Sequence, residues 1–369
     1  MPKTPTVYDV ADRAGVSIAT VSRVLRRPDD VRESTRDLVL RAVRELGYVP
    51  SGAARGLAAR QTGVLGLCFP DVDGIDDVAD LPALSRTGRR VEVVVDHGQV
   101  AASRWSNLYI GEVMRGAELE AWRTGLAVMI AVARGARRDD VVADLAGRVD
   151  GLAVLSATVP DDVLEHVERR IPVVIMAGPR HGDRHDHISV DNAAGMQALT
   201  RHLLVDHGAR DLAFVGGPAT SPDDADRFAG FRAALGEAGL PAPDDVAWRG
   251  DFTRSTAREL ARRMLDARDR GVPLPGALVC SNDQTALGML DVLSGAGVHV
   301  PGDVLLTGFD GIDAGQVSSP RLTTVRQPMV ELGRAAVARL RERMADPGRP
   351  PSSESLPVTV ILRESCGCH

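Results

Sequence analysis

The stretch "GVSIATVSRVL", from Gly15 to Leu25, has the composition of a short helix that follows a turn. Gly15 can adopt the left-handed backbone of a sharp turn, and Ser17 is a good N-cap for a helix that reaches about Leu25. A Thr-x-x-Asp motif begins at Thr6 and predicts a first helix over 7–14. Two short helices joined by a glycine-containing turn are typical of the helix-turn-helix motif.

The apolar residues of these two helices have the spacing of two faces that pack together. We expect six of them to form this contact: Val10, Ala11, Ala14, Val16, Val21 and Val24. The outward residues at the start and middle of the second helix are then Ser17, Ile18, Ala19, Ser22 and Arg23. In DNA-binding modules this end of the helix enters the major groove.

A third helix and a short linker helix are predicted to follow. Ser34 is the expected N-cap of the third helix, and Gly47 is expected to end it. Its apolar stripe is Leu38, Val39, Ala42, Val43 and Leu46. Pro50 and Ser51 then mark the start of a two-turn helix over about 53–60, which is too short to persist alone in water.

Charge is distributed unevenly along the 369 residues, whose net charge is −6. Residues 1–60 hold eleven Lys/Arg and seven Asp/Glu, a net charge of +4, so the remainder carries −10. A basic head on an acidic body favours a DNA-binding domain joined to a domain with another role. The chain has no apolar run of about 20 residues and no signal peptide, which predicts a cytoplasmic protein without a membrane partner.

The four cysteines predict no metal site. Cys68 and Cys280 lie in apolar runs and are expected to be inert core residues. The terminal "CGCH" has metal-binding residue types but no apparent second ligand cluster, so we expect a frayed tail. The segment "GPRHGDRHDH" (178–187) is interpreted as a flexible polar linker rather than a metal site. No cofactor is expected.

The body shows short apolar runs alternating with helical stretches. The runs span 64–69, 126–132, 151–156, 172–177, 212–217, 277–281 and 304–309. Such runs are typical of parallel strands covered on both faces, and two sheets suit about 300 residues better than one. Enzyme motifs are lacking: no G-x-G-x-x-G follows the first strand, and there is no Walker sequence or G-x-S-x-G elbow. We therefore expect no enzyme.

The chain resembles the LacI/GalR family of bacterial transcriptional regulators over nearly its whole length. In the head the resemblance rests on "TVYDVADRAGVSIATVSRVL", "VRESTRDLVLRAVRELGYVP" and "AARGLAARQTGVLGL". In the body it rests on "SVDNAAG", "FVGGP…DRFAGF", "CSNDQTALGML", "GFDG", "LTTVRQP" and "LPVTVILRESCG".

The resemblance implies a small all-α helix-turn-helix head (1–49), a hinge helix and linker (50–61), and an effector-binding and dimerisation body (62–369). The body would resemble periplasmic sugar-binding proteins, with two doubly wound parallel-sheet subdomains around a ligand cleft. Subdomain N would span about 62–187 plus 324–350, and subdomain C about 188–323 plus 351–365. The helix near 329–346 would return to the first subdomain and the strand 358–363 to the second.

The resemblance also assigns DNA contacts. Ile18, Ala19 and Arg23 lie where the family reads bases, and arginine suits the paired acceptors of guanine. Ser17, Thr20 and Ser22 are expected to contact phosphates. Leu57 lies where the family inserts a leucine wedge into the minor groove, with Arg55 along that groove. The alternative for Leu57 is packing against the hinge helix of a partner chain.

The effector site is expected at the carboxyl ends of the strands, as in open α/β sheets. Asp191, Asp283 and Asp310 follow strands, and Arg227 is expected just before a helix. Carboxylates and an arginine fork suit the hydroxyl groups of a sugar. By resemblance, Arg227 and Asp283 match effector-binding positions, and Phe252 matches an aromatic that stacks on the ligand. Helix capping by Asp191 and Asp283, and core packing of Phe252, are the alternatives.

One departure from the family pattern affects this site. Pro70–Asp71 and Asn107–Tyr109 are nearly adjacent in the family but are separated here by a long insertion. Its segment 89–96 reads as an extra strand. The insertion leaves the ligand-contact roles of Asp71, Asn107 and Tyr109 open, although Tyr109 is kept as a candidate effector contact.

These observations predict a homodimeric transcriptional repressor that binds double-stranded operator DNA and responds to a small effector, with a sugar favoured. A purine co-repressor is the alternative within the same architecture. A sugar-binding protein of the transport type is a third possibility, which the basic head and the missing signal peptide disfavour.

Overall fold

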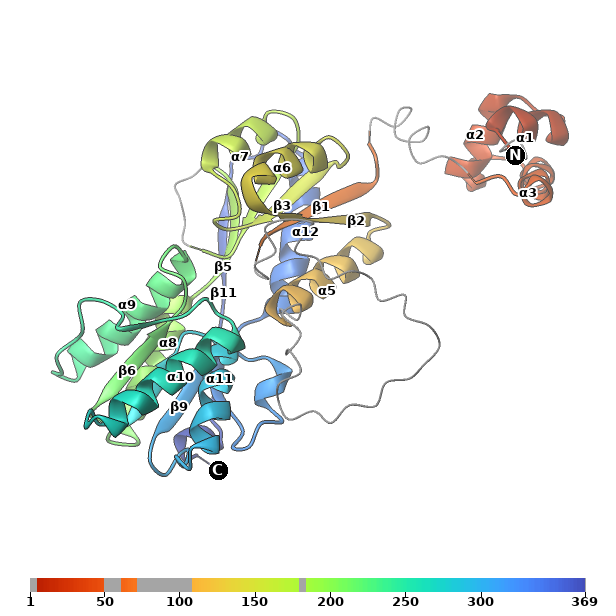
Figure 1. Cartoon of the computed structure of the whole chain (residues 1–369). Helices are drawn as coiled ribbons and strands as arrows, with labels where there is room; N and C mark the ends of the chain where they lie inside the picture. The colour runs from red at the N-terminus through yellow and green to blue at the C-terminus, as the bar shows by residue number, and fades with distance from the viewer. Residues whose placement is uncertain (1–4, 50–60, 72–107, 179–183, 369) are drawn as a thin grey trace, which may run out of the picture. The chain divides into compact units, whose positions relative to one another are not determined.

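The computed structural model describes residues 5–49, 61–71, 108–178 and 184–368 (Figure 1). The chain divides into two compact units, Met1–Gly63 and Val64–His369. The predicted hinge helix over 53–60 and the predicted extra strand over 89–96 lie outside the described residues.

The head contains three α-helices: α1 (Val7–Ala14), α2 (Ile18–Arg26) and α3 (Glu33–Leu46). Thr6 and Asp9 form a reciprocal capping box at the start of α1, and Gly15 ends that helix with a φ of 66°. The Ser17 hydroxyl accepts the Thr20 N–H at the start of α2. The turn and both helix starts are thus confirmed.

Most of the predicted head packing is confirmed. Five apolar side chains from α1, α2 and α3 are almost inaccessible to solvent: Val10, Ala11, Val21, Val24 and Val39. Two predictions for α3 are wrong. Arg32 rather than Ser34 is its N-cap, and Leu38 is 49% exposed. Leu38 lies about 100° around the helix axis from the buried Val39 and faces solvent, whereas Leu40 is half-buried against the core of the head.

The first sheet of the body has six strands in the order β11-β5-β4-β3-β1-β2. All neighbouring pairs in it are parallel. The strands are β1 (Val64–Pro70), β2 (Ala127–Ala133), β3 (Gly151–Leu155), β4 (Val173–Met176), β5 (Asp186–Val190) and β11 (Ser353–Leu356). The central strands are apolar on both faces because helices cover both sides.

The second sheet has six strands in the order β12-β10-β9-β8-β6-β7. Its neighbouring pairs are parallel except for β10 and β12, which are antiparallel. The strands are β6 (Leu212–Gly216), β7 (Trp248–Arg249), β8 (Ala277–Cys280), β9 (Leu305–Asp310), β10 (Thr323–Arg326) and β12 (Thr359–Ile361). The two predicted parallel-sheet subdomains are therefore present.

Eight helices in the described part of the body pack against these sheets, in pairs that Figure 1 makes visible. They are α5 (Leu108–Arg123), α6 (Arg138–Ala146), α7 (Asp161–Glu168), α8 (Asn192–Val205), α9 (Pro222–Glu237), α10 (Arg254–Asp269), α11 (Asp283–Gly295) and α12 (Met329–Ala345). The last helix, α12, lies against α5 of the first subdomain, as predicted. Gly116 and Gly333 let the two backbones touch, since a Cβ at either would collide with a carbonyl oxygen of the other helix.

The chain crosses between the two sheets three times, and the crossings differ from the predicted boundaries. Residues up to Val190 belong to the first sheet, and β10 belongs to the second. After α12 the chain adds β11 to the first sheet before β12 joins the second. The predicted boundaries therefore misplace β10 and β11. Strand β11 pairs with β5, whose edge would otherwise be unpaired.

Candidate functional site

The outward face of α2 carries the side chains predicted to read DNA. Ser17, Ile18, Ala19 and Arg23 are exposed, and Thr20 and Ser22 are half-buried. Ile18 is 39% exposed, so its side chain is accessible for an apolar contact with a base. The valines of the same helix are buried, so the division of α2 into a packing face and a free face is confirmed.

Arg23 differs from several other arginines of the head because no described residue forms an ion pair with it. Arg13 pairs with Glu45 at 2.5 Å, while Arg27 and Arg36 have acidic neighbours within 4.0 Å. An unpaired guanidinium on the free face of α2 can donate to a base edge or a phosphate without first breaking an internal contact. Leu57 and Arg55 lie outside the described residues.

A polar cluster centred on Arg227 lies at the carboxyl-terminal edge of the second sheet. Arg227 is buried within α9, and the prediction that it precedes a helix is wrong. Its Nε donates to Asn192 Oδ1 at 2.8 Å, and its Nη1 donates to the Ser281 carbonyl at 2.7 Å. The guanidinium also stacks on Phe309, with its carbon 4.0 Å from the ring centre. These contacts fix the orientation of the arginine fork.

Asp310, the last residue of β9, is a second charged member of the polar cluster around Arg227. Its Oδ1 lies 3.5 Å from Arg227 Nη1 and accepts a hydrogen bond of 2.7 Å from Gln327 Nε2. Burial raises the pKa of the Asp310 carboxyl to about 6, although the charge of Arg227 and the Gln327 hydrogen bond lower it. The backbone of Asp310 has a φ of 117°, which is strained for a residue with a side chain and is found preferentially at functional sites.

Asp283 is fully buried beside this cluster and makes only internal contacts. Its Oδ2 accepts the N–H groups of Gly311 and Ile312, and its Oδ1 meets the Thr324 hydroxyl at 2.6 Å. The N-cap of α11 is Asn282, so the capping alternative for Asp283 is wrong. Burial, followed by the charge of Asp310, raises the pKa of Asp283 to about 8.

Tyr109 and Asp223 connect the polar cluster around Arg227 to the first subdomain. Burial raises the pKa of the Tyr109 hydroxyl, Asp223 and Asp310 raise it further, and Arg227 lowers it, so all three charges lie within electrostatic reach. Asp223 Oδ1 accepts from Gly178 N at 2.9 Å and from Asn192 Nδ2 at 2.7 Å. Because Gly178 follows β4 and Tyr109 lies in the first turn of α5, both subdomains contribute to the cluster.

The two remaining candidates lie at the same edge. Asp191 caps α8 through the Ala194 N–H at 2.9 Å and is exposed, so the capping alternative is confirmed for this residue. Phe252 is half-buried, and its ring packs so closely on Gly217 that a Cβ there would collide with it. Its carbonyl accepts from Asn282 Nδ2 at 3.1 Å.

Sequence reasoning missed several polar members of the cluster. Asn192, Asp223 and Gln327 each bind one of the predicted residues or each other, and Asp226 adds a further carboxyl. Burial raises the pKa of Asp226, and the charge of Asp223 raises it further. Asn192 and Gln327 stand inside the "SVDNAAG" and "LTTVRQP" stretches, so the signal was present without an assigned role.

Asp71 and the histidine-rich segment have structural partners. Asp71 accepts from Arg134 Nη1 at 3.0 Å. The linker interpretation is wrong for residues 185–187. Asp186 is buried in β5, where Arg343 Nε lies 2.9 Å from its Oδ2 and Arg339 Nη1 lies 3.3 Å from its Oδ1. His187 contacts the Ala177 carbonyl. His185 is buried with its Nδ1 2.7 Å from Glu168.

The prediction of a frayed tail is also wrong. Cys366 is fully buried, and Cys368 lies close to two histidines that are distant in sequence. No helix among the described residues is long and apolar enough to cross a membrane.

Comparisons with known proteins agree with this architecture. Residues 6–51 match the family described as bacterial regulatory proteins, lacI family, and residues 201–366 match a periplasmic binding protein-like domain. The chain is 30% identical over 365 residues to the HTH-type transcriptional repressor PurR of Vibrio parahaemolyticus, with 98% of each chain covered.

Two solved structures show a similar fold. The transcriptional regulator CelR–cellobiose complex has a TM-score of 0.67 and 27% identity, covering 98% of this chain and 99% of that one. The lac repressor dimer bound to operator and the anti-inducer ONPF has a TM-score of 0.78 and 24% identity, covering 99% of each chain.

Proposed function

This chain belongs to the lacI family of bacterial regulatory proteins, and from that premise we propose which residues carry its regulation. It is a DNA-binding transcriptional repressor, not an enzyme. We assign base reading to Ile18, Ala19 and Arg23 of α2, and phosphate contacts to Ser17, Thr20 and Ser22. The observation that supports this assignment is the free face of α2, which carries both an unpaired arginine and an exposed isoleucine.

Replacing Arg23 with alanine is expected to weaken operator binding by about 1–3 kcal/mol and to relax the base preference at one position, because a bidentate contact to guanine is lost. The measurement is a gel-shift titration at fixed salt with operators substituted at each position. Arg41→Ala on α3 is the matched control because it removes one positive charge away from α2. If Arg23→Ala and Arg41→Ala lower the affinity equally for every operator sequence, base reading by Arg23 is contradicted.

Leu57→Ala is expected to weaken operator binding without unfolding the body, because an apolar wedge stabilises the bent DNA. The same titration tests it, with thermal unfolding of the variant as the control for folding. Unchanged affinity would overturn the wedge. Arg55 is proposed to lie along the same minor groove.

For the effector, we propose the cluster around Arg227 as the binding site. Its members come from both subdomains, and a ligand there changes the contacts that hold them together, of which the Asp223–Gly178 hydrogen bond is one. An effector shifts a repressor between states only by binding one state more tightly. The hydrogen bonds from Arg227 to described residues leave from Nε and Nη1, so Nη2 is positioned to donate to the ligand.

A sugar is the effector that this chemistry favours. Asp191, Asp223, Asp226 and Asp310 offer several carboxyl acceptors for vicinal hydroxyls around one arginine, while Phe252 offers an apolar ring face. The CelR relative was solved with cellobiose. A purine is the second candidate, and the carboxamides of Asn192 and Gln327 favour it.

The test is a gel shift with the DNA upstream of the gene that encodes this chain. A panel of mono- and disaccharides and of purine bases is added to the protein–DNA complex. A sugar that weakens or strengthens operator binding supports a sugar effector. If only purine bases change operator binding, a purine replaces the sugar as the proposed effector. We also propose a homodimer, since two heads on a two-fold axis match the two halves of a palindromic operator.

A further inference from the structure

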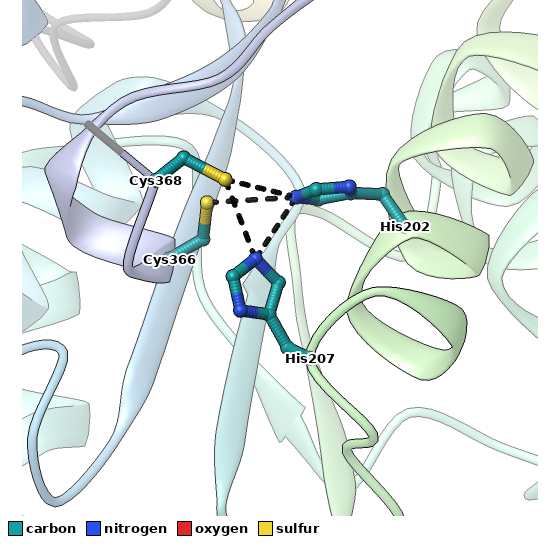
Figure 2. A group of neighbouring side chains, drawn as sticks. All are labelled: His202, His207, Cys366 and Cys368. Carbon is teal, nitrogen blue, oxygen red and sulfur yellow. Dashed lines mark hydrogen bonds between the residues drawn. The ribbon is translucent and has the colours of Figure 1, made fainter.

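Four metal-ligating side chains meet at the carboxyl-terminal end of the chain (Figure 2). His202 lies in the last turn of α8, and His207 follows that helix. Cys366 and Cys368 come from the final segment, more than 150 residues later in the sequence. Figure 2 shows both sulfur atoms and both Nε2 atoms directed toward one another.

The distances between the ligand atoms have the scale of a tetrahedral metal site. In a zinc site with ordinary bond lengths, neighbouring ligand atoms are separated by about 3.3 Å for N···N, about 3.6 Å for N···S and about 3.8 Å for S···S. Here His202 Nε2 lies 3.1 Å from His207 Nε2 and 3.5 Å from Cys368 Sγ. The His207 Nε2–Cys368 Sγ distance is 3.4 Å, and the His202 Nε2–Cys366 Sγ distance is 3.8 Å. All four ligand atoms lie within 4.8 Å of one another.

The surroundings orient these ligands. His202 Nδ1 lies 2.6 Å from Asp206 Oδ2, an arrangement that fixes the ring and leaves Nε2 for the metal, as in carboxylate–histidine–zinc sites. Gly367 has a φ of 94°, and this left-handed turn places the two cysteines on the same side of the chain. Thr323 Oγ1 lies 3.1 Å from Cys366 Sγ and can donate to a thiolate there.

We propose that His202, His207, Cys366 and Cys368 form a structural zinc site. Two thiolates and two imidazoles suit Zn²⁺ rather than Mg²⁺ or Ca²⁺, and four protein ligands leave no open position for catalysis. The metal would fasten the end of the chain to the end of α8. It would thereby hold the segment that follows β12, the antiparallel edge strand of the second sheet.

The test uses the full-length chain, grown with added zinc and purified with a reductant but without a chelator. Inductively coupled plasma mass spectrometry is expected to find about one zinc per chain. Exchange for Co²⁺ is expected to give the thiolate charge-transfer absorption and the intense visible bands of a tetrahedral site. Removal of zinc by a chelator is expected to lower the melting temperature and to expose Cys368 to a thiol reagent.

Variants locate the metal. Cys368→Ser and His207→Gln are expected to lower the zinc content at least tenfold, whereas His166→Gln, an exposed histidine on α7, keeps it. Cys368→His retains a ligand and is expected to bind cobalt with a weaker thiolate absorption, which keeps the test valid if another variant fails to fold.

Three results would overturn the zinc site. They are a wild-type chain without bound zinc, equal zinc contents in wild type and the ligand variants, and a Cys366–Cys368 disulfide in the zinc-supplied protein. Because none of these measurements involves DNA or a sugar, they are independent of the proposed effector site.

Discussion

Replacing Arg227 with lysine is expected to weaken effector binding about a hundredfold while the repressor still folds and binds its operator. Lysine keeps a positive charge near Asp310 but lacks the planar fork that now contacts Asn192 and the Ser281 carbonyl. Loss of one or two charge-assisted hydrogen bonds to the ligand costs about 1.5–3 kcal/mol each, and every 1.4 kcal/mol is about tenfold in affinity.

The measurement is calorimetric titration with the compound that the operator screen identifies, followed by gel shift with and without that compound. Arg258→Lys is the matched control, since Arg258 of α10 also pairs with a carboxylate, that of Asp291 in α11, and is not a member of the Arg227 cluster. Arg227→Met should go further and also destabilise the body, because it leaves the buried Asp310 without its cation. Effector affinity equal to wild type in Arg227→Lys would remove Arg227 from the site.

Asp283→Asn is expected to stabilise the body at neutral and alkaline pH and to change its pH dependence. Burial raises the pKa of Asp283 to about 8, so the folded chain holds this proton over a range in which the unfolded chain has released it. Because the usual aspartate pKa is near 3.8, this pH range extends from about 3.8 to about 8. Within it the folded state binds more protons, and stability is lost as the pH rises, by up to about 1.4 kcal/mol per pH unit.

Asparagine cannot ionise, and its carbonyl can still accept from Gly311 and Ile312 while its amide meets the Thr324 hydroxyl. Urea unfolding of both proteins from pH 5 to pH 8 measures the effect, as the difference in the free energy of unfolding. Asp266→Asn, which removes an exposed carboxylate from α10, is the control for the change in net charge. A difference between wild type and Asp283→Asn that stays constant with pH would contradict the raised pKa.

Local patterns in the sequence predicted the head nearly completely. The capping box at Thr6, the turn at Gly15 and the alternation of valines with polar residues act over a few residues, so helix starts, helix ends and the free face of α2 followed from them. The apolar strands of the body were predicted for the same reason. The exposed Leu38 shows the limit, because apolar spacing alone does not decide which flank of a helix stripe the neighbouring helices cover.

The polar cluster could be predicted only in part. Asp310 and Asp283 were found because residues after parallel strands meet at one edge, but their different contacts were not. Whether a carboxylate faces a ligand, caps a helix or is buried depends on which N–H groups the fold brings to it. For Asp283 those groups belong to Gly311 and Ile312, 28 and 29 positions away.

By itself the sequence determined the helix-turn-helix head, the two-sheet body and membership of a repressor family. Helix caps and hydrophobic periods act over a few residues, and the family motifs follow one another along the chain. Tertiary structure alone decided where the chain crosses between the sheets, which polar groups surround Arg227, and what the last residues do. In the sequence, no second pair of ligands lies near Cys366 and Cys368. The fold supplies that pair, since it places the end of α8 against the end of the chain.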